Sequence, residues 1–276
     1  MLQGRNDVEW ISYFNSNMRK FSDDGIIFHG AYGFRWRQHF SFDQIERVIS
    51  LLKNNPNSRR AVIQMWDCVV DLYKKEEQAP KDLPCNDLIF LQILDGKLDM
   101  SVICRSQDII WGAYGANSVH FSILQEYIAG MLGIRMGLLY QFSNNYHAYV
   151  DIFEKNCSLI DMARDPYRTI SYCPYTRDEV YVKSLVDDAS AFDLELNDFV
   201  EGNKIIQRSN SIFEILTSIQ DAYICWKEDK DYEKAYEHLQ SIPLEGNKSL
   251  DWVRACTEWL ARRQHLVCEQ ERGRER

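Results

Sequence analysis

The sequence lacks three features that would each define a broad class of protein. No apolar run approaches the roughly 20 residues that a helix needs to cross a bilayer, and residues 1–5 have neither the basic nor the apolar region of a secretory signal. The 8 cysteines show no C-x-x-C spacing, so neither a zinc site nor a disulfide framework is indicated. The formal net charge of -9 argues against a general nucleic-acid surface, which needs basic patches. We therefore expect a cytoplasmic protein that binds no metal, membrane or nucleic acid.

Length and composition allow either one large folded core or one core with a smaller appended unit. The 276 residues are 45% hydrophobic and 13% aromatic, as in an ordinary globular protein. The composition changes after about residue 195. Beyond that point, helical periodicity predicts three helices, at residues 211–226, 231–241 and 249–267. We expect a main domain over residues 1–195 and a helical C-terminal extension over residues 196–276.

A β-hairpin is predicted in the first half of the chain. Residues 88–94 and 97–104 have the character of strands, and Asp95-Gly96 between them favours a tight type I′ turn. Apolar and polar side chains alternate along the second strand, so one of its faces should be buried. The positions expected on the buried face are Leu98, Met100, Val102 and Cys104.

Two chemically distinctive motifs flank this hairpin. Asp82-Leu83-Pro84-Cys85-Asn86 precedes the first strand, and Arg105-Ser106-Gln107-Asp108 ends the second. An antiparallel hairpin brings its two open ends together. Cys85 should therefore lie beside Arg105, and a nearby cation favours the thiolate form of a cysteine. The pattern predicts a nucleophile next to an anion site.

Helices and strands are predicted on both sides of the hairpin. Residues 41–54 open with a capping-box pattern at Ser41 and carry an apolar stripe, which indicates an amphipathic helix. A buried strand is expected at residues 61–66, directly after Arg59 and Arg60. Two arginines at the start of a strand suit a phosphate or a partner carboxylate.

After the hairpin, a loop is expected at residues 111–118, because it contains two glycines. A helix with a broad apolar face should follow at residues 119–132 and pack on the sheet. Strand character resumes at residues 138–142.

Seven motifs between about residues 30 and 155 resemble, in order and approximate spacing, the thymidylate synthase family. They are Tyr32-Gly33-Phe34-Arg35-Trp36-Arg37, Asn55-Pro56-Asn57-Ser58-Arg59-Arg60, Pro84-Cys85, Asp95-Gly96-Lys97-Leu98, Arg105-Ser106-Gln107-Asp108, Asn117 and His147-Ala148-Tyr149. The resemblance implies an α/β (α+β) fold, with a large twisted mixed sheet flanked by helices. It also implies an obligate homodimer that acts on a pyrimidine nucleoside monophosphate, with 5,10-methylenetetrahydrofolate as cosubstrate.

The resemblance also implies roles in catalysis and in recognition of the nucleoside. Cys85 would add to C6 of the base, which makes C5 able to attack the one-carbon unit of the folate. Tyr32 would relay the proton at C5. Asn117 would bind the O4 and N3 edge of the base, and His147 and Tyr149 would bind the sugar hydroxyl.

The remaining implied roles concern the phosphate and the folate. Arg105 and Ser106 would bind the phosphate of the nucleotide. By the resemblance, Arg59 and Arg60 would reach the phosphate in the active site of the neighbouring subunit. The two parallel N–H groups of a guanidinium suit a phosphate dianion. Asp108 would bind the pterin ring of the folate.

Three departures from the family pattern lie close to these residues. Asn86 follows the nucleophile where the family usually has histidine, and Cys104 stands where a glutamine usually precedes the Arg-Ser pair. One extra residue is also expected in the loop at residues 111–116. These departures should reshape the pocket for the base and the folate.

Further departures concern the two ends of the sequence. The resemblance starts within the first helix of the family, so the N-terminal part of the family domain and its glutamate are expected to be missing. Glu9 could replace this glutamate, although a solvated helix residue is the more ordinary interpretation. The charged residues 269–276 stand where the family has an apolar tail that closes over the ligands and excludes water. Water could then add to the methylene intermediate, which places hydroxymethylation slightly ahead of reductive methylation.

Several functions stay open at this point. Asn117 favours uracil, because an amide can donate to O4 and accept from N3-H, so dUMP is preferred to dCMP. A protein of the same fold that binds the nucleotide without catalysis, as a scaffold, is the second hypothesis. A cysteine hydrolase that uses Cys85 and His147 is the third, and no oxyanion-hole pattern supports it.

Overall fold

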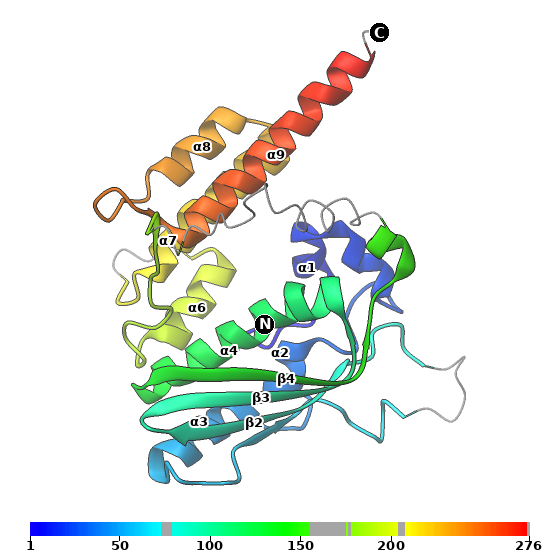
Figure 1. Cartoon of the computed structure of the whole chain (residues 1–276), viewed down its shortest axis with the longest axis vertical. Helices are drawn as coiled ribbons and strands as arrows, with labels where there is room; N and C mark the ends of the chain where they lie inside the picture. The colour runs from blue at the N-terminus through cyan, green and yellow to red at the C-terminus, as the bar shows by residue number, and fades with distance from the viewer. Residues whose placement is uncertain (73–78, 155–174, 176–177, 204–207, 275–276) are drawn as a thin grey trace, which may run out of the picture. The chain divides into compact units, whose positions relative to one another are not determined.

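The computed structural model in Figure 1 describes residues 1–72, 79–154, 175, 178–203 and 208–274, without the side chains after residue 264. The chain divides into two compact units, Met1–Asn156 and Cys157–Arg276. The division expected near residue 195 stays a prediction.

The first unit is built on a mixed sheet. Its described strands are β1 (Val62–Gln64), β2 (Asn86–Leu94), β3 (Lys97–Asp108) and β4 (Arg135–His147), in the order β1-β2-β3-β4. The pairs β1/β2 and β2/β3 are antiparallel, whereas β3 and β4 are parallel. The mixed sheet flanked by helices confirms the fold class expected from the sequence.

The turn between β2 and β3 has the expected conformation. Asp95 has a φ of 48° and Gly96 a φ of 69°, and a type I′ turn requires positive φ at both central residues. The predicted inward face of β3 is confirmed. Its four side chains are all fully buried, namely Leu98, Met100, Val102 and Cys104.

Helix α4 (Asn117–Leu132) connects the parallel strands β3 and β4, which need a crossover of this kind. Figure 1 shows it running along one face of the sheet. Its Gln125 side chain donates to the backbone oxygens of Leu98 at 2.7 Å and Leu138 at 3.2 Å. A polar side chain therefore joins the helix to the ends of both neighbouring strands.

The stretch before α4 differs from the expected loop. Residues Ile109–Ala116 form a widened helical turn, η3, which is interrupted at Gly115. The Asp108 side chain caps this turn by accepting a hydrogen bond from the Trp111 backbone nitrogen. The two glycines suggested a loop, but the capping carboxylate allows helical hydrogen bonding to begin directly after β3.

The other helical segments of this unit precede the hairpin. They are α1 (Val8–Phe14), a 3-10 turn (Ser16–Phe21), α2 (Tyr32–Arg37) and α3 (Gln44–Asn54).

Helix α3 is confirmed, but its cap was predicted wrongly. The Asp43 side chain, not Ser41, accepts from the backbone nitrogen of Glu46, at 2.9 Å. Ser41 instead adopts a left-handed backbone, with a φ of 65°. The predicted apolar stripe is buried and consists of Ile45, Val48, Ile49 and Leu52.

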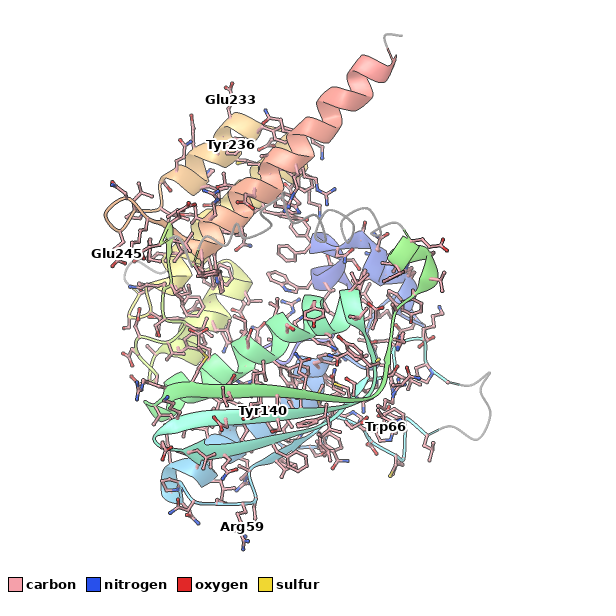
Figure 2. All side chains as sticks on the ribbon, viewed as in Figure 1. Arg59, Trp66, Tyr140, Glu233, Tyr236 and Glu245 are labelled. Atoms are coloured by element: carbon pink, nitrogen blue, oxygen red, sulfur yellow. The ribbon has the colours of Figure 1, made fainter. Side chains whose placement is uncertain are left out.

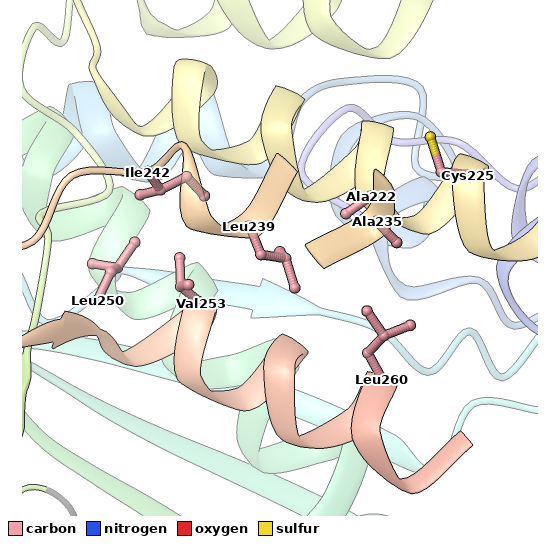
Figure 3. Close-up of a cluster of buried hydrophobic side chains, with 8 residues drawn as sticks. All are labelled: Ala222, Cys225, Ala235, Leu239, Ile242, Leu250, Val253 and Leu260. Atoms are coloured by element: carbon pink, nitrogen blue, oxygen red, sulfur yellow. The ribbon is translucent and has the colours of Figure 1, made fainter. Parts of the chain in front are cut away.

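The second unit is mainly helical, as predicted. Its described elements are β5 (Val180–Tyr181), α6 (Phe192–Glu201), α7 (Ile212–Ile224), a wide helical turn (Cys225–Asp229), α8 (Tyr232–Gln240), β6 (Ser249–Leu250) and α9 (Asp251–Arg274). Figure 3 shows the apolar core between α7, α8 and α9, formed by Ala222, Cys225, Ala235, Leu239, Ile242, Leu250, Val253 and Leu260. Within the ranges given above, no helix combines the length and the apolar character that crossing a bilayer requires.

Candidate functional site

Cys85 and Arg105 lie side by side at the open end of the hairpin. Asn86 pairs with Cys104 across β2 and β3, and the Arg105 backbone nitrogen donates to the Cys85 oxygen at 3.0 Å. The Arg105 Nη2 lies 4.0 Å from the Cys85 Sγ. The hairpin therefore brings together the thiol and the cation that the sequence analysis placed near each other.

The Arg105 side chain is held on one side and free on another. Its Nε donates to the Pro84 oxygen at 2.9 Å, and its Cζ lies 5.3 Å from the centre of the Trp66 ring. Within the described part of the chain, the Arg105 Nη1 and the Ser106 hydroxyl make no hydrogen bond. Two neighbouring donors are thus available for an anion.

The electrostatic surroundings of Cys85 work in opposite directions. Burial raises the pKa of the thiol, and the carboxylates of Asp82 and Asp87 raise it further. The Arg105 guanidinium lowers this pKa, but it does not cancel the effect of burial. The reactivity of Cys85 therefore depends on how closely Arg105 is held against it.

Two of the departures from the family pattern contact each other behind Cys85. Asn86 is fully buried, and its Oδ1 accepts a hydrogen bond from the Cys104 thiol at 2.9 Å. Burial raises the pKa of Cys104 to about 12, so this thiol stays protonated and can donate. The sequence analysis treated the two positions as separate changes, whereas the fold makes them one pair.

Tyr32 and Asn117 also meet, although 85 positions separate them. The Tyr32 hydroxyl donates to the Asn117 Oδ1 at 3.4 Å. The Tyr32 ring is stacked on Phe121, with their centres 6.0 Å apart. Burial raises the pKa of Tyr32, so its hydroxyl remains a hydrogen-bond donor near neutral pH. Asn117 is itself buried at the start of α4.

Asp108 and His147 are paired at the C-terminal ends of β3 and β4, and Arg105 lies near the same end of β3. One oxygen of the Asp108 carboxylate caps η3, and the other is buried without a hydrogen bond to any described residue. The His147 Nδ1 lies 3.0 Å from the Asn145 Oδ1. Its ring centre is 5.3 Å from that of Tyr149, which is exposed.

Arg59 and Arg60 are not part of this cluster. Both are exposed in the turn between α3 and β1, and Figure 2 shows Arg59 extending away from the ribbon. The pairing of Val62 with Phe90 places this turn toward the closed end of the hairpin. Cys85 lies at the opposite, open end. Within one chain, these arginines are therefore remote from the thiol.

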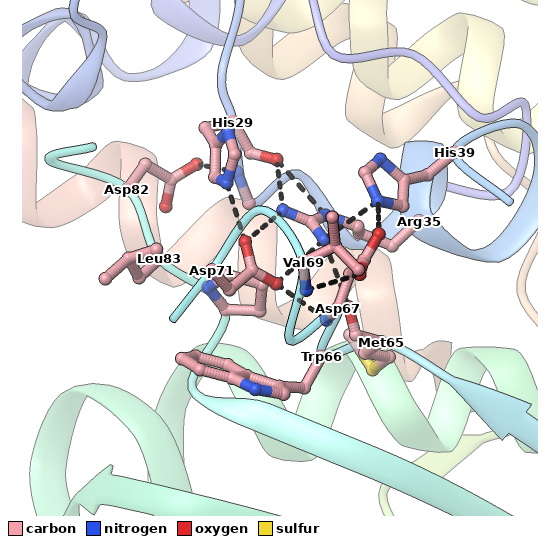
Figure 4. A network of polar contacts seen from close by, with 12 residues as sticks. His29, Arg35, His39, Met65, Trp66, Asp67, Val69, Asp71, Asp82 and Leu83 are labelled. Carbon is pink, nitrogen blue, oxygen red and sulfur yellow. Dashed lines mark hydrogen bonds and ion pairs between the residues drawn. The ribbon is translucent and has the colours of Figure 1, made fainter. Parts of the chain in front are cut away.

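The sequence analysis missed a buried polar network next to the site, centred on Arg35 and Asp71 (Figure 4). It also assigned no role to Trp66, which contacts Arg105. Arg35 lies within a quoted motif, but nothing in the local pattern indicates its partner, which lies 36 positions away. The position of Trp66 at the end of the predicted strand was the available signal that it could contact the site.

The chain is similar in sequence to several known proteins. The family model described as thymidylate synthase matches residues 1–209. A deoxyuridylate hydroxymethyltransferase of Pseudomonas phage M6 is 40% identical over 270 residues, which cover 95% of this chain and 74% of the relative. A second deoxyuridylate hydroxymethyltransferase, of Bacillus phage SP01, is 37% identical over 161 residues, covering 55% of this chain but only 41% of the relative.

A solved structure is also similar to part of the chain. Thermostable thymidylate synthase A of Bacillus subtilis is 25% identical, with a TM-score of 0.47, over 58% of this chain and 56% of that one. Members of the matched family are transferases that use 5,10-methylenetetrahydrofolate as cosubstrate. The family match covers the whole site described above, and the chain belongs to the thymidylate synthase family.

Proposed function

We propose that this protein transfers a one-carbon unit to C5 of a pyrimidine nucleoside monophosphate and forms a 5-hydroxymethyl nucleotide. The favoured substrate is dUMP, with dCMP as the alternative. The observation that carries the proposal is the Cys85 thiol 4.0 Å from the Arg105 guanidinium, whose Nη1 makes no hydrogen bond to a described residue and can bind a phosphate.

In the proposed mechanism, Cys85 acts as a nucleophile toward C6 of the base. The addition makes C5 nucleophilic, because the negative charge is delocalised onto C5 and O4. The folate cosubstrate supplies the one-carbon unit that C5 attacks. Arg105 favours the thiolate before the attack, and its free Nη1 can bind the nucleotide phosphate together with the Ser106 hydroxyl.

The proposed recognition of the base uses Asn117. An amide can donate to O4 and accept from N3-H of uracil, whereas cytosine presents the opposite pattern. Asn117 is buried, and its amide oxygen contacts the Tyr32 hydroxyl. This contact supports a proton relay through Tyr32. His147 and Tyr149 are proposed to bind the sugar, and Asp108 is proposed to bind the pterin through its free carboxylate oxygen.

The hydroxymethyl product is favoured over the methyl product by the relatives. The M6 relative is a deoxyuridylate hydroxymethyltransferase, and its similarity extends over nearly the whole of this chain, including the helical second unit. In hydroxymethylation, water adds to the one-carbon unit and tetrahydrofolate is released. In reductive methylation, the folate donates a hydride and dihydrofolate is released.

A homodimer is proposed through the open face of the sheet. β4 exposes Leu138, Tyr140 and Phe142, which alternate along one side of the strand. The strand register continues this apolar surface onto β3 and β2, where Phe142 aligns with Ile103 and Leu88. Exposed apolar surfaces of this kind are typical of protein interfaces.

The dimer would give Arg59 and Arg60 a function. They are remote from Cys85 of their own chain, and as exposed guanidinium groups they are proposed to reach the phosphate in the partner subunit's site. A cytoplasmic location stays a prediction.

The test is incubation with dUMP or dCMP and 5,10-methylenetetrahydrofolate, followed by mass analysis of the nucleotide. We expect the 5-hydroxymethyl product from dUMP and release of tetrahydrofolate. A 5-methyl product with dihydrofolate would refute hydroxymethylation. Nucleotide binding without tritium release from C5-labelled substrate would instead favour the scaffold hypothesis.

A further inference from the structure

Arg35 of α2 and Asp71 form a fully buried ion pair. The Arg35 Nη2 donates to the Asp71 Oδ1 at 2.8 Å, and its Nη1 donates to the Asp71 Oδ2 at 2.9 Å. Both side chains have an exposed fraction of 0%. A buried pair is costly to desolvate, and it is maintained only when further hydrogen bonds satisfy both groups.

Those further hydrogen bonds fix two backbone segments (Figure 4). The Arg35 Nε donates to the His29 oxygen at 3.2 Å, and its Nη1 reaches the Met65 oxygen at 3.4 Å. The Asp71 Oδ2 also accepts from the Asp67 backbone nitrogen at 2.8 Å. The turn from Met65 to Asp71 is therefore held at both ends. Arg35 binds Met65 and Asp71, and the Asp71 side chain binds the backbone of Asp67 within the turn.

The fixed turn carries Trp66, which lies between the anchored residues Met65 and Asp67. The backbone nitrogens of Met65 and Trp66 also donate to the Asp87 oxygen, at 2.9 and 3.2 Å. The Trp66 ring faces the Arg105 guanidinium at 5.3 Å, a cation–π distance. The Trp66 side chain thus connects the Arg35–Asp71 ion pair to Arg105, the residue expected to bind the phosphate.

A second connection leads from the same pair to the segment before Cys85. The His29 Nε2 lies 2.7 Å from the Asp71 Oδ1, and the next residue, Gly30, donates its backbone N–H to the Asp82 Oδ2 at 3.0 Å. A Cβ on Gly30 would lie 2.7 Å from the backbone oxygen of Asp82, so the two backbones are in close contact. The pair supports the Cys85 segment from this side as well.

We infer that Arg35 and Asp71 are positioning residues for catalysis, which hold Trp66 against Arg105 and so keep the guanidinium beside Cys85. This inference rests on the proposed roles of Arg105 and Cys85. Neither Arg35 nor Asp71 would touch the substrate, because both are buried behind the turn.

The experiment follows the reactivity of Cys85 and needs no turnover. The rate of alkylation by iodoacetamide is measured against pH for the full chain, and modification of Cys85 is followed by peptide mass, because Cys68 is also exposed. We expect the Asp71→Asn variant to shift the Cys85 profile to higher pH, since the guanidinium that lowers the pKa of the thiol is no longer held in place. An unchanged profile in a folded variant would overturn the inference.

Asp43→Asn is the matched control. Asp43 pairs with Arg37 of helix α2 at 2.6 Å and accepts from the Glu46 backbone nitrogen at 2.9 Å, so the two oxygens of its carboxylate bind α2 and α3 and not the turn that carries Trp66. Asparagine can still cap α3. The control therefore removes one carboxylate charge, as Asp71→Asn does, without removing the cap. We expect its Cys85 profile to match that of the wild type. A shift as large as that of Asp71→Asn would mean that any lost ion pair has this effect, and it would overturn the inference.

Trp66→Leu tests the connection itself and covers the case in which Asp71→Asn does not fold. We expect this variant to raise the pH of Cys85 alkylation in the same direction. If both single variants fold, the double variant should shift the profile less than the sum of the two, because coupled residues are not additive. An unchanged Trp66→Leu profile, or a fully additive double variant, would contradict positioning through Trp66.

With a substrate in hand, the KM for the nucleotide should increase about 10- to 100-fold in Asp71→Asn, because misplacing a binding group by about 1 Å has effects of this size. An unchanged KM would count against positioning of Arg105. If the wild type processes neither nucleotide, the proposed function fails, whereas the alkylation profiles still decide the inference about Asp71.

Discussion

At the scale of single residues, the proposed chemistry of the site depends on one thiol and one guanidinium. Cys85 is partly buried, which opposes ionisation, and Arg105 is the cation that favours it. The backbone holds the two together through a hydrogen bond of 3.0 Å. The distance between the side chains can therefore change without unfolding the hairpin.

Replacing Arg105 by methionine should slow the alkylation of Cys85 at neutral pH. Burial raises the pKa of Cys85, so its reactive thiolate increases as pH rises, and loss of the cation moves the profile further upward. The measurement is the pH dependence of the modification rate. Lys81→Met is a suitable control, because the Lys81 Nζ donates to the Ser22 oxygen instead of facing Cys85. A profile unaffected by Arg105→Met would mean that Arg105 does not control the thiol.

Replacing Cys85 by serine should reduce turnover by about 10³-fold or more, because an alcohol is a much poorer nucleophile than a thiolate. Nucleotide binding should persist, since Arg105 and Ser106 remain in place. Calorimetry with dUMP and the product assay measure the two properties. A Cys85→Ser protein that retained most of its turnover would contradict the shared mechanism.

Replacing Asn117 by aspartic acid should change the preferred base. A protonated carboxyl group or carboxylate can accept from the amino group of cytosine, whereas the amide suits uracil. We expect the ratio of kcat/KM for dUMP over dCMP to fall by about 10-fold or more, which corresponds to about 1.4 kcal/mol. An unchanged ratio would exclude Asn117 from base recognition.

At the scale of elements, local sequence signals predicted the hairpin and helices α3 and α4 well, but not α1, α2 or α6. The Asp95-Gly96 turn and the alternation along β3 depend on neighbouring residues, and both were found as expected. Contacts between distant residues could not be predicted in this way. Arg35 and Asp71 are buried together although each is charged, and no periodicity indicates which charged residues will find a buried partner.

Smaller errors also have physical reasons. Ser41 matched the capping-box pattern, but the left-handed backbone at this residue leaves Asp43 to cap α3. The glycines after β3 suggested a loop, but the Asp108 carboxylate begins a helical turn there. In each case a carboxylate close to the predicted boundary decided where the helix starts.

The capping assignment predicts different costs for two neighbouring substitutions. Asp43→Ala should lower the free energy of unfolding by about 1 kcal/mol through the lost cap, and the broken contact with Arg37 adds to this loss. Ser41→Ala should have a smaller effect, because the Ser41 side chain does not cap the helix. Urea denaturation of both variants measures the difference. Equal losses would contradict the cap assigned to Asp43.

At the scale of the whole molecule, the open face of the sheet and the remote arginines support the same proposal. If Arg59 and Arg60 act on the partner subunit's site, one active site should contain residues of two chains. Mixing an inactive Cys85→Ser protein with an inactive Arg59→Ala/Arg60→Ala protein should then restore activity. Mixed dimers would contain one site with neither defect. Mixtures that stay inactive after subunit exchange would contradict the shared site.

The apolar strip on β4 also has a consequence for the survival of the protein. If a second copy covers Tyr140 and Phe142, folding and pairing are linked by mass action. Dilution would then lower the melting temperature, and scarce protein would be more prone to proteolysis than abundant protein. The same surface that assembles the site would make the lifetime of each molecule depend on how many others are present.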